Sequence, residues 1–311
     1  MKEEFFINQF QSKYIGDDGA VIEWEEKVGS KKQGVGSREQ RAGNGKQEAG
    51  KREEEKGKRW KRGKKEVIAS DSFFENIHFK RDWFELDEIS YKASLVNISD
   101  MIVMNAKPKY AVLNVAFPKT LSLKEIKKLA DGFKKASKEY GYEIIGGDTI
   151  RSDKIAISVT HIGYTKKPIY RKAKINEYVA FTGDIGNVKR DLIRALRFNK
   201  INKNSKLIKP VLRDKFFYKA SKFITAACDI SDGLFKELER ISKISNVNYQ
   251  FLKNIDKNRG CSGEEFEILF TFPKKNLKAI QNIAKITKTP LTIFAVTKRG
   301  RFYSICPENH F

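Results

Sequence analysis

The chain has 311 residues, about twice the length of a typical single domain, so we expect two domains. Hydrophobic residues make up 40% of it and aromatic residues 12%, which excludes a mostly disordered chain. The net charge of +23 is compatible with nucleic acid, an anionic surface or phosphorylated ligands as partners. We favour a lysine-rich proteome as its origin, because Ile, Phe, Asn and Lys are all abundant and a total does not locate the charge.

We expect no membrane anchor, no secretion signal and no disulfide framework. No run of about 18 apolar residues occurs, and the start "MKEEFFINQF" carries acids where a signal peptide has an apolar core. The three cysteines, Cys228, Cys261 and Cys306, are few and lack metal-ligand spacing. This usage is typical of a reducing compartment, so we expect a cytoplasmic protein.

Residues 23–65 differ in composition from the rest of the chain. The segment is rich in Lys, Arg, Glu and Gly and has no Ile, Leu or Phe, so it cannot bury enough apolar surface to offset the entropy of ordering. We expect a low-complexity insertion that forms a mobile loop between two short strands. A basic arm for nucleic acid is the alternative reading.

The predicted elements of the first half alternate between strands and helices. They are a strand at 15–22, a strand at 66–70, a helix at 89–106, a strand at 110–118, a helix at 122–141, and strands at 142–150 and 154–164. The helix at 122–141 opens on a serine cap and ends at Gly141.

The second half follows from Thr165. Its predicted elements are a strand and glycine turn at 177–186, a helix at 187–198, a helix at 213–225, a strand at 226–231, a helix at 232–245, a strand at 266–273, a helix at 274–287 and a strand at 291–299. The pattern predicts an α/β protein, in the sense of an α+β two-domain fold. We expect an N-terminal domain with a mixed sheet over 1–164 and a C-terminal α+β domain over 165–311.

Aspartates recur at turns flanked by Gly or Ser, each beside an apolar run. The stretches are "IGDDGAVI" (15–22), "VNISDMI" (96–102), "IIGGDTIRS" (144–152) and "CDISDGLF" (228–235). One such turn alone is more often a simple turn or helix cap. Four together predict that Asp17, Asp18, Asp71, Asp100, Asp148, Asp229 and Asp232 converge in space.

Converging carboxylates repel one another unless cations neutralise them, and Mg²⁺ prefers oxygen ligands that it shares with substrate phosphates. Gly146 and Gly147 would let backbone N–H groups approach a phosphate, and Arg151 could bind its oxygens. The chain has no P-loop pattern and no protein-kinase motifs. Phosphoryl transfer would therefore depend on metal ions and positioned phosphates.

These blocks resemble the thiamine-monophosphate kinase family, in the superfamily of aminoimidazole ribonucleotide synthetase and selenophosphate synthetase. The matching blocks are "IGDDGAV", "SDSFFENIHF", "YKASLVNISDMIVMNAKPKYAVLNVAFP", "IIGGDTIRS", "DISDGLFKEL" and "SGEEFEILFTF". They occur in the family's order and cover nearly the whole chain outside 23–65.

The resemblance implies ATP-dependent phosphorylation of thiamine monophosphate to thiamine diphosphate, by direct in-line transfer with several Mg²⁺ ions. It implies a homodimer formed through the N-terminal domains, with the ATP site between the two domains. The residues that resemble metal ligands are Asp18, Ser70, Asp71, Asp100, Asp148, Asp229 and Asp232. Those that resemble ATP contacts are Gly147, Asp148, Arg171 and Ser231, and those that resemble thiamine phosphate contacts are His78 and Glu264.

The chain departs from the family pattern at three places. Ala69 replaces a threonine, which removes one oxygen ligand, and the stretch from Ser262 to Glu267 replaces Gly-Gly-Glu-Asp-Tyr-Glu. Glu308 stands where the family often has an aromatic residue over the thiamine ring, so either Phe311 or an upstream aromatic such as Tyr303 covers the ring or substrate affinity is reduced.

Two alternatives differ from this kinase. One is another ATP-using enzyme of the same superfamily with a different acceptor; the selenophosphate branch is disfavoured because no cysteine precedes Cys228. The other is a nucleic-acid-binding protein that uses the basic arm at 23–65, whose affinity would fall steeply with salt. We expect neither a nucleic-acid partner nor a membrane.

Overall fold

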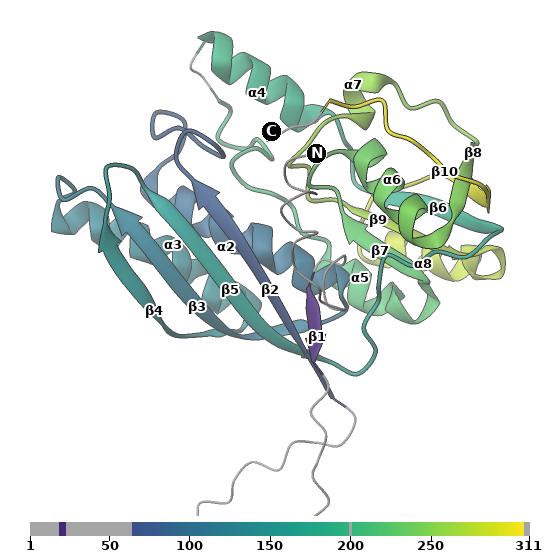
Figure 1. The fold of residues 1–311 in the computed structure, drawn as a ribbon, viewed down its shortest axis with the longest axis horizontal. Coiled ribbons are helices and arrows are strands. Elements are labelled where there is room, and N and C mark those ends of the chain that lie inside the picture. Colours follow the sequence, from purple (N-terminus) through teal and green to yellow (C-terminus); the bar gives the residue numbers. More distant parts are fainter. Residues whose placement is uncertain (1–18, 23–63, 199–200, 308–311) are drawn as a thin grey trace, which may run out of the picture.

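The computed structural model describes residues 19–22, 64–198 and 201–307 and arranges them around two five-stranded sheets (Figure 1). The expected two-sheet mixture of strands and helices is confirmed, with a mixed sheet in the first half. The domain boundary between residues 164 and 165 stays a prediction. Asp17, Asp18, Glu308, Phe311 and residues 23–63 lie outside the described residues.

The first sheet has the strand order β1-β2-β5-β3-β4, in which β3 and β4 are parallel and the other neighbours are antiparallel. The expected pairing of the two strands that flank the insertion is confirmed, since Ala20 lies opposite Ile68. The elements of this half are β1 (Ala20–Ile22), β2 (Lys65–Phe74), α2 (Leu86–Val103), β3 (Lys107–Phe117), α3 (Leu123–Tyr140), β4 (Glu143–Arg151) and β5 (Ala156–Thr165).

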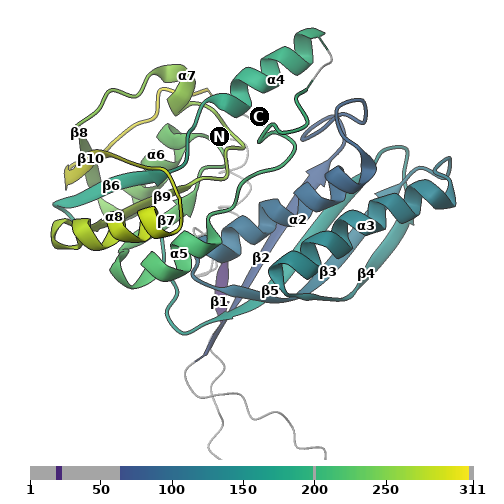
Figure 2. The same cartoon turned by 180° about the vertical axis from the view of Figure 1, so that it is seen from behind.

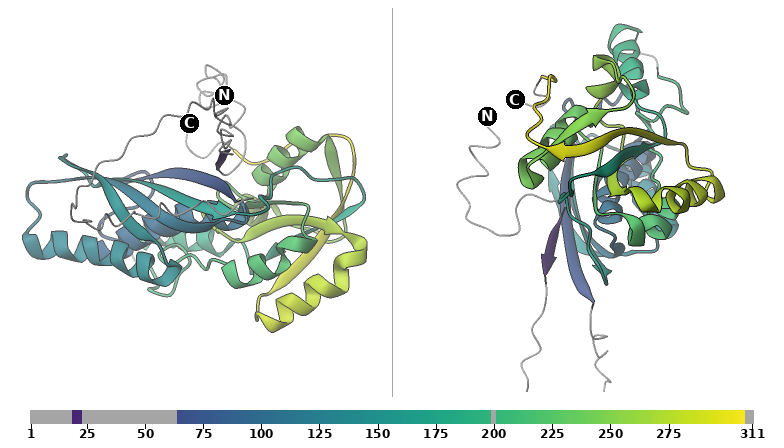
Figure 3. Two further views of the ribbon diagram at one scale, coloured as in Figure 1. Left: turned by 90° about the horizontal axis from the view of Figure 1, so that it is seen from below. Right: turned by 90° about the vertical axis from the view of Figure 1, so that its right-hand side faces the viewer.

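Helices α2 and α3 lie on one face of this sheet (Figure 2; seen edge-on in Figure 3, left). Helix α3 begins at its predicted cap, where the Ser122 hydroxyl accepts a hydrogen bond from the Glu125 N–H, and it ends at Gly141 in the left-handed conformation. Its buried Leu129, Phe133 and Ala136 point to the sheet and α2 because they recur at helical spacing.

The opposite face of the first sheet has no helix on it in the part of the chain that the structure describes (Figure 1). Strand β4 is exposed along its whole length, and its Ile145 and Ile150 are 55% and 59% exposed. An open sheet face that ends in an exposed, apolar edge strand is a surface that proteins usually cover.

The second sheet is antiparallel, with the strand order β7-β9-β6-β10-β8. Its elements are β6 (Glu177–Thr182), α4 (Asn187–Phe198), α5 (Asp214–Ala220), η1 (Ser221–Phe223), β7 (Ala226–Asp229), α6 (Leu234–Ser245), β8 (Val247–Phe251), α7 (Lys257–Gly260), β9 (Ile268–Pro273), η2 (Lys274–Asn276), α8 (Leu277–Ile286) and β10 (Leu291–Arg299). Hydrophobic clusters lie on both faces of this sheet, one with α5 and α8 and one with α6.

Helix α2 joins the two halves. Its Leu95 and Ile98 belong to the same hydrophobic cluster as Phe216 of α5 and Phe270 of β9. Most of α2 is buried, including its polar residues Lys92 and Asn97. The helix is therefore a central element between the two sheets, and the polar side chains on it must find partners inside the protein.

Two expectations were wrong or incomplete. Cys261 and Cys306 form a disulfide, contrary to the expectation of none, because the C-terminal segment returns to the loop after α7. Because two of the three cysteines are paired, the cysteines no longer support the expectation of a reducing compartment. Strand β8 was not predicted, because "VNYQF" is short and follows its helix with only Asn246 between them. None of the described helices is long and apolar enough to cross a membrane.

Candidate active site

Asp71 is held against the central helix by Asn97. Strand β2 alternates its side chains, so Asp71 faces the helix side together with the buried Ala69 and Phe73. The Asn97 amide Nδ2 donates to Asp71 Oδ2 over 3.2 Å. The Asn97 Oδ1 in turn lies 2.6 Å from His161 Nδ1 and accepts from the His161 backbone N–H. Two fully buried residues, Asn97 and His161, therefore fix the orientation of this partly buried carboxylate.

Asp229 is held by Ser99, two residues further along the same helix. It ends β7, is 2% exposed, and accepts a 2.8 Å hydrogen bond from the Ser99 hydroxyl at Oδ2. Asp100 follows on α2 and is partly exposed. Helix α2 thus contacts one carboxylate from each sheet, Asp71 of β2 and Asp229 of β7, and itself carries Asp100, a third predicted metal ligand.

The turn between β7 and α6 carries two further predicted residues, Ser231 and Asp232. Both lie at the fully buried Glu237, since Ser231 Oγ and the Asp232 backbone N–H donate to Glu237 Oε1 over 3.4 Å each. Asp232 Oδ2 also accepts from Arg240 over 2.5 Å. The predicted ATP contact Arg171 lies 3.7 Å from Glu237 Oε2.

This cluster is nearly balanced in charge, with two arginines facing two carboxylates. Burial alone would lower the pKa of Arg240, but Glu237 and Asp232 outweigh it and the pKa is raised. Arg240 and Glu237 did not come out of the sequence analysis. The i,i+3 spacing of Glu237 and Arg240 on α6 was the available signal for their pairing.

Glu264 lies beside Ser231 in an unusual backbone conformation. Its φ is +55° and that of Phe266 is +50°, which is uncommon for residues with a side chain. Two backbone hydrogen bonds hold this loop, from Glu264 N–H to Ser231 O (2.7 Å) and from Phe266 N–H to Ile230 O (3.0 Å). Strained residues persist where the surrounding structure fixes them, which is typical of ligand sites.

Lys92 is a site residue that the sequence analysis missed. It is completely buried on α2, and its ammonium group donates to Glu264 Oε2 and to the Leu207 carbonyl over 2.7 Å each. The rings of Phe73 and Phe84 lie 5.4 and 5.5 Å from Nζ. From the sequence alone, a lysine among apolar helix positions is expected to be an ordinary surface residue.

His78 follows β2 and also contacts Phe73. Its ring stacks on that of Phe73 with centroids 5.4 Å apart, and its Nδ1 accepts from the Phe74 N–H over 3.0 Å. The two predicted thiamine phosphate contacts, His78 and Glu264, are therefore linked through Phe73 and Lys92.

Asp148 and Ser70 lie on the other side of the first sheet. Asp148 is in register with Asn114, whose Oδ1 accepts from the Asp148 N–H over 3.1 Å, and Ser70 Oγ lies 2.8 Å from Thr160 Oγ1. Strand alternation turns both side chains toward the open face, away from α2. The described residues alone therefore do not bring Asp148 to Asp71 and Asp229.

Gly147 has a packing reason to be glycine that differs from the expected phosphate contact. Its φ is +141°, and a Cβ there would lie 1.7 Å from the Leu113 carbonyl oxygen. Any side chain would force β4 away from β3. Arg151 is exposed at the end of β4.

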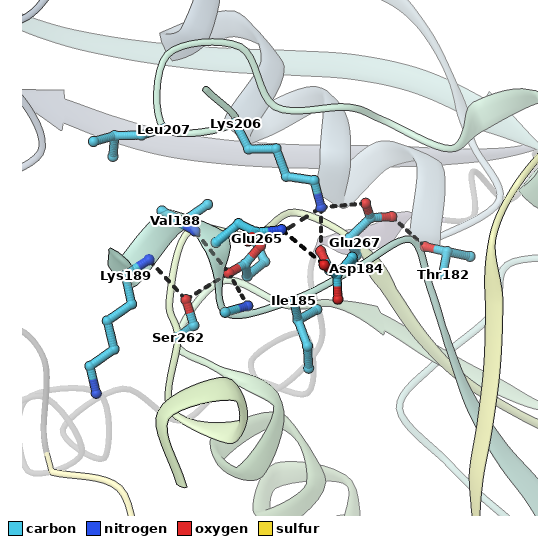
Figure 4. Close-up of polar contacts among 12 residues, drawn as sticks. Thr182, Asp184, Ile185, Val188, Lys189, Lys206, Leu207, Ser262, Glu265 and Glu267 are labelled. Atoms are coloured by element: carbon cyan, nitrogen blue, oxygen red, sulfur yellow. Dashed lines mark hydrogen bonds and ion pairs between the residues drawn. The ribbon is translucent and has the colours of Figure 1, made fainter. Parts of the chain in front are cut away.

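A buried ionic cluster is built around Glu265 and Glu267, directly after Glu264 in the chain (Figure 4). Glu267 is fully buried and binds Arg213 through two 2.8 Å bonds, Lys206 over 2.6 Å and the Thr182 hydroxyl over 2.8 Å. The neighbouring Glu265 accepts from the backbone N–H groups of Gly186 and Val188 at the start of α4.

This cluster fixes the loop, since it anchors the residues that follow Glu264. Burial raises the pKa of Glu265, against hydrogen bonds from Ser262 and the charge of Lys206. Because Glu265 already occupies the N-terminal N–H groups of α4, that helix end is satisfied by the protein itself.

The donor chemistry fits Mg²⁺, although no described group of three or more acidic, histidine or cysteine side chains is close enough to enclose an ion. Asp71, Asp100, Asp229 and Asp232 supply oxygen ligands only, and Asn97 and Ser99 orient two of them through one oxygen each. Mg²⁺ is usually held by one or two carboxylates and completed by water and substrate phosphates. Such a site does not need a closed protein cage.

The comparison with known proteins gives one family model and a group of relatives. The family model for the N-terminal domain of AIR synthase related protein matches residues 53–165. The thiamine-monophosphate kinase of Methanocaldococcus jannaschii is 33% identical over 237 residues, which cover 65% of this chain and 74% of that protein. The enzyme of the same name from Bacillus subtilis is 32% identical over 213 residues, covering 63% of this chain and 64% of that protein.

Solved structures share the fold. The structure of AaThiL complexed with AMPPCP and TMP superimposes with a TM-score of 0.76 at 22% identity, covering 97% of this chain and 91% of that one. Thiamine-monophosphate kinase from Stenotrophomonas maltophilia K279a gives a TM-score of 0.70 at 24% identity, with 78% and 85% covered. The HypE–HypF complex also matches, with a TM-score of 0.69 at 18% identity, covering 96% of this chain and 93% of that one.

Proposed function

Because the chain belongs to the thiamine-monophosphate kinase family, we propose that it transfers the γ-phosphate of ATP to thiamine monophosphate, giving thiamine diphosphate and ADP. The observation that carries the proposal is the position of α2. Its Asn97 donates to Asp71 of the first sheet over 3.2 Å, and its Ser99 donates to Asp229 of the second sheet over 2.8 Å. A helix that orients one carboxylate from each sheet suits a polyphosphate with bound cations as the ligand.

The metal ligands in this proposal are Asp18, Ser70, Asp71, Asp100, Asp148, Asp229 and Asp232. When bound, Mg²⁺ neutralises the charge of the reacting phosphates. The protein's own contribution is to orient the carboxylates through hydrogen bonds that are already made, so little reorganisation remains at the moment of reaction. Ala69 contributes no oxygen, and its methyl group packs in a small hydrophobic cluster with Val67 and Met101.

The nucleotide contacts in the proposal are Gly147, Asp148, Arg171 and Ser231. Arg171 and Ser231 share the Glu237 cluster, so they belong to one rigid group on the second sheet. His78 and Glu264 contact the thiamine phosphate. The carboxylate of Glu264 suits a substrate that carries a cationic thiazolium ring and amino-group donors.

We further propose that the functional unit is a homodimer in which a second copy covers the open face of the first sheet. Support comes from the exposed Ile145 and Ile150 of β4 and from the position of Asp148 and Ser70 on that face. A second copy would place a protein surface over Asp148, which the described residues of one chain leave exposed. Sedimentation equilibrium of the wild type and of Ile150→Lys tests this proposal. We expect the wild type to be a dimer and Ile150→Lys to be a monomer. A monomeric wild type would contradict the proposal.

The catalytic proposal is tested by measuring ADP release in the presence of ATP, Mg²⁺ and thiamine monophosphate, with the product identified by mass. Asp229→Asn should lower the turnover number by at least about 100-fold, because it removes a charge aimed at the phosphates. A deletion of 23–63 should keep turnover. ATP hydrolysis without thiamine diphosphate would leave the family assignment in place but would mean a different acceptor.

A further inference from the structure

The position of Lys92 on its helix does not explain why a charged side chain is buried there. It lies on α2, whose neighbouring residues Ala93 and Leu95 belong to the hydrophobic core, and it is 0% exposed. Taking an ammonium group out of water costs several kcal/mol unless it gains good partners. An apolar residue of the same length would pack at this position without that cost, so the charge serves another purpose.

The partners of Lys92 come from three separate parts of the chain. Nζ donates to Glu264 Oε2 on the loop before β9 and to the Leu207 carbonyl on the connection between α4 and α5, both over 2.7 Å. The rings of Phe73 and Phe84 enclose the ammonium group at 5.4 and 5.5 Å. Lys92 therefore ties the first half of the chain to the loop that carries Glu264.

Glu264 needs such a tie. Its side chain is 28% exposed, so without a partner it could turn into solvent, and its backbone has a φ of +55°. The Ser231 carbonyl fixes its backbone N–H, and among the described residues Lys92 is the cation that pairs with its carboxylate. A carboxylate with one oxygen fixed on a buried ammonium group presents its remaining lone pairs in a defined direction.

The Phe73 ring also contacts His78, which stacks on it with centroids 5.4 Å apart, while Lys92 Nζ lies 5.4 Å from the same ring. We propose that Lys92 is a positioning residue for thiamine phosphate: it holds the Glu264 carboxylate toward the substrate and locks the Leu207 segment beside it. The inference rests on the proposed function. It assigns Lys92 to acceptor binding and leaves ATP binding to other residues.

The test is calorimetric titration of thiamine monophosphate into the full-length wild type, Lys92→Met, Glu264→Gln and the double variant Lys92→Met/Glu264→Gln. Methionine keeps the volume of the lysine stem and removes the charge. We expect Kd for thiamine monophosphate to rise at least tenfold in Lys92→Met, while the KM for ATP stays within twofold. The double variant should bind no more than about threefold worse than either single variant, since both act through one contact.

Tyr91→Phe is the matched control. Tyr91 precedes Lys92 on α2, is 8% exposed, and its hydroxyl donates to Glu139 over 2.7 Å. This variant should lose a hydrogen bond of the same length from the same helix and keep the affinity for thiamine monophosphate within threefold. If Lys92→Met fails to fold, the double variant removes both charges together, is expected to fold, and should bind as weakly as Glu264→Gln.

The outcomes separate the inference from the proposed function. A wild type that does not bind thiamine monophosphate overturns both. A wild type that binds, with Lys92→Met binding equally well, overturns only the role of Lys92. Equal losses for ATP and thiamine monophosphate in Lys92→Met would also overturn it, because they would indicate a general structural defect.

Discussion

His161 shows that the orientation of a predicted metal ligand depends on a buried polar residue that the ligand does not contact. It lies on β5 with no exposure, its Nδ1 is 2.6 Å from Asn97 Oδ1, and the Tyr142 ring packs edge-on at 4.6 Å. Asn97 then holds Asp71. The orientation of Asp71, a predicted metal ligand, thus depends on the Asn97 amide that it contacts and on the His161 ring that contacts this amide.

Burial lowers the pKa of His161 from its ordinary 6.5 to about 4. The folded state keeps the ring neutral, while the unfolded chain takes up a proton below pH 6.5. This contribution to stability is therefore complete above pH 6.5 and is lost as the pH falls toward 4.

We expect urea unfolding to show the wild type losing about 2 kcal/mol more stability than His161→Gln between pH 7.5 and 5. Glutamine can keep a bond to Asn97 but does not titrate. Parallel pH dependences of the two proteins would mean that His161 is protonated or accessible in the folded state.

At the scale of elements, helix α3 packs on α2 at a single close approach. A Cβ at Gly132 would lie 2.1 Å from the Asp87 carbonyl oxygen and 2.1 Å from Ser90 Oγ. The two helices can lie this close because residue 132 has no side chain. Since α2 also carries Lys92, Asn97 and Ser99, a shift of α2 would reach the candidate site.

Gly132→Ala should therefore destabilise the protein by at least about 1 kcal/mol, although alanine favours a helix over glycine by nearly that amount. Chemical denaturation measures the change. Lys138→Ala, on the exposed side of the same helix, is the control and should change stability by less than about 0.5 kcal/mol. A stabilised Gly132→Ala would mean that α2 and α3 are further apart than described.

The Cys261–Cys306 bond joins the C-terminal segment to the loop after α7, across a sequence separation of 45 residues. Closing a loop of this length in the unfolded chain stabilises the folded state by up to about 4 kcal/mol. We expect a dithiol reductant to lower the melting temperature of the wild type to that of Cys306→Ser. Reductant should leave Cys306→Ser unchanged, and a wild type that is insensitive to reductant would contradict the bond.

Local sequence patterns were sufficient for most elements, because apolar periodicity and caps act within a few residues. Ser122 and Gly141 mark the ends of α3 as predicted. The same patterns missed Lys92, Glu237 and Arg213, whose partners lie 172, 66 and 54 positions away along the chain, at Glu264, Arg171 and Glu267 respectively. Long-range pairing of this kind depends on how the two sheets pack, which no local pattern encodes. The disulfide escaped prediction for the same reason.

At the scale of the whole molecule, the two sheets share one central helix and one hydrophobic cluster. Phe266 and Phe270 of the second half pack in the same cluster as Leu95 and Ile98 of α2. The candidate site lies along the polar side of this junction. Its geometry therefore depends on how the halves are held together, and Lys92 is the charged link among these contacts.

The open face of the first sheet carries predicted site residues of its own. Asp148 and Ser70 lie there, on the side of the sheet away from Asp71. The family motif that contains Asp148 thus needs either a second copy or a rearranged segment to meet the other carboxylates. The proposed dimer supplies the first of these.

The transfer of phosphate from ATP to thiamine monophosphate is tested most directly by following the label. ATP labelled in its γ-phosphate, mixed with thiamine monophosphate, Mg²⁺ and the full-length protein, should give thiamine diphosphate labelled in its terminal phosphate, with no label on the protein. Label found only as inorganic phosphate, or in no product at all, would contradict the proposed reaction.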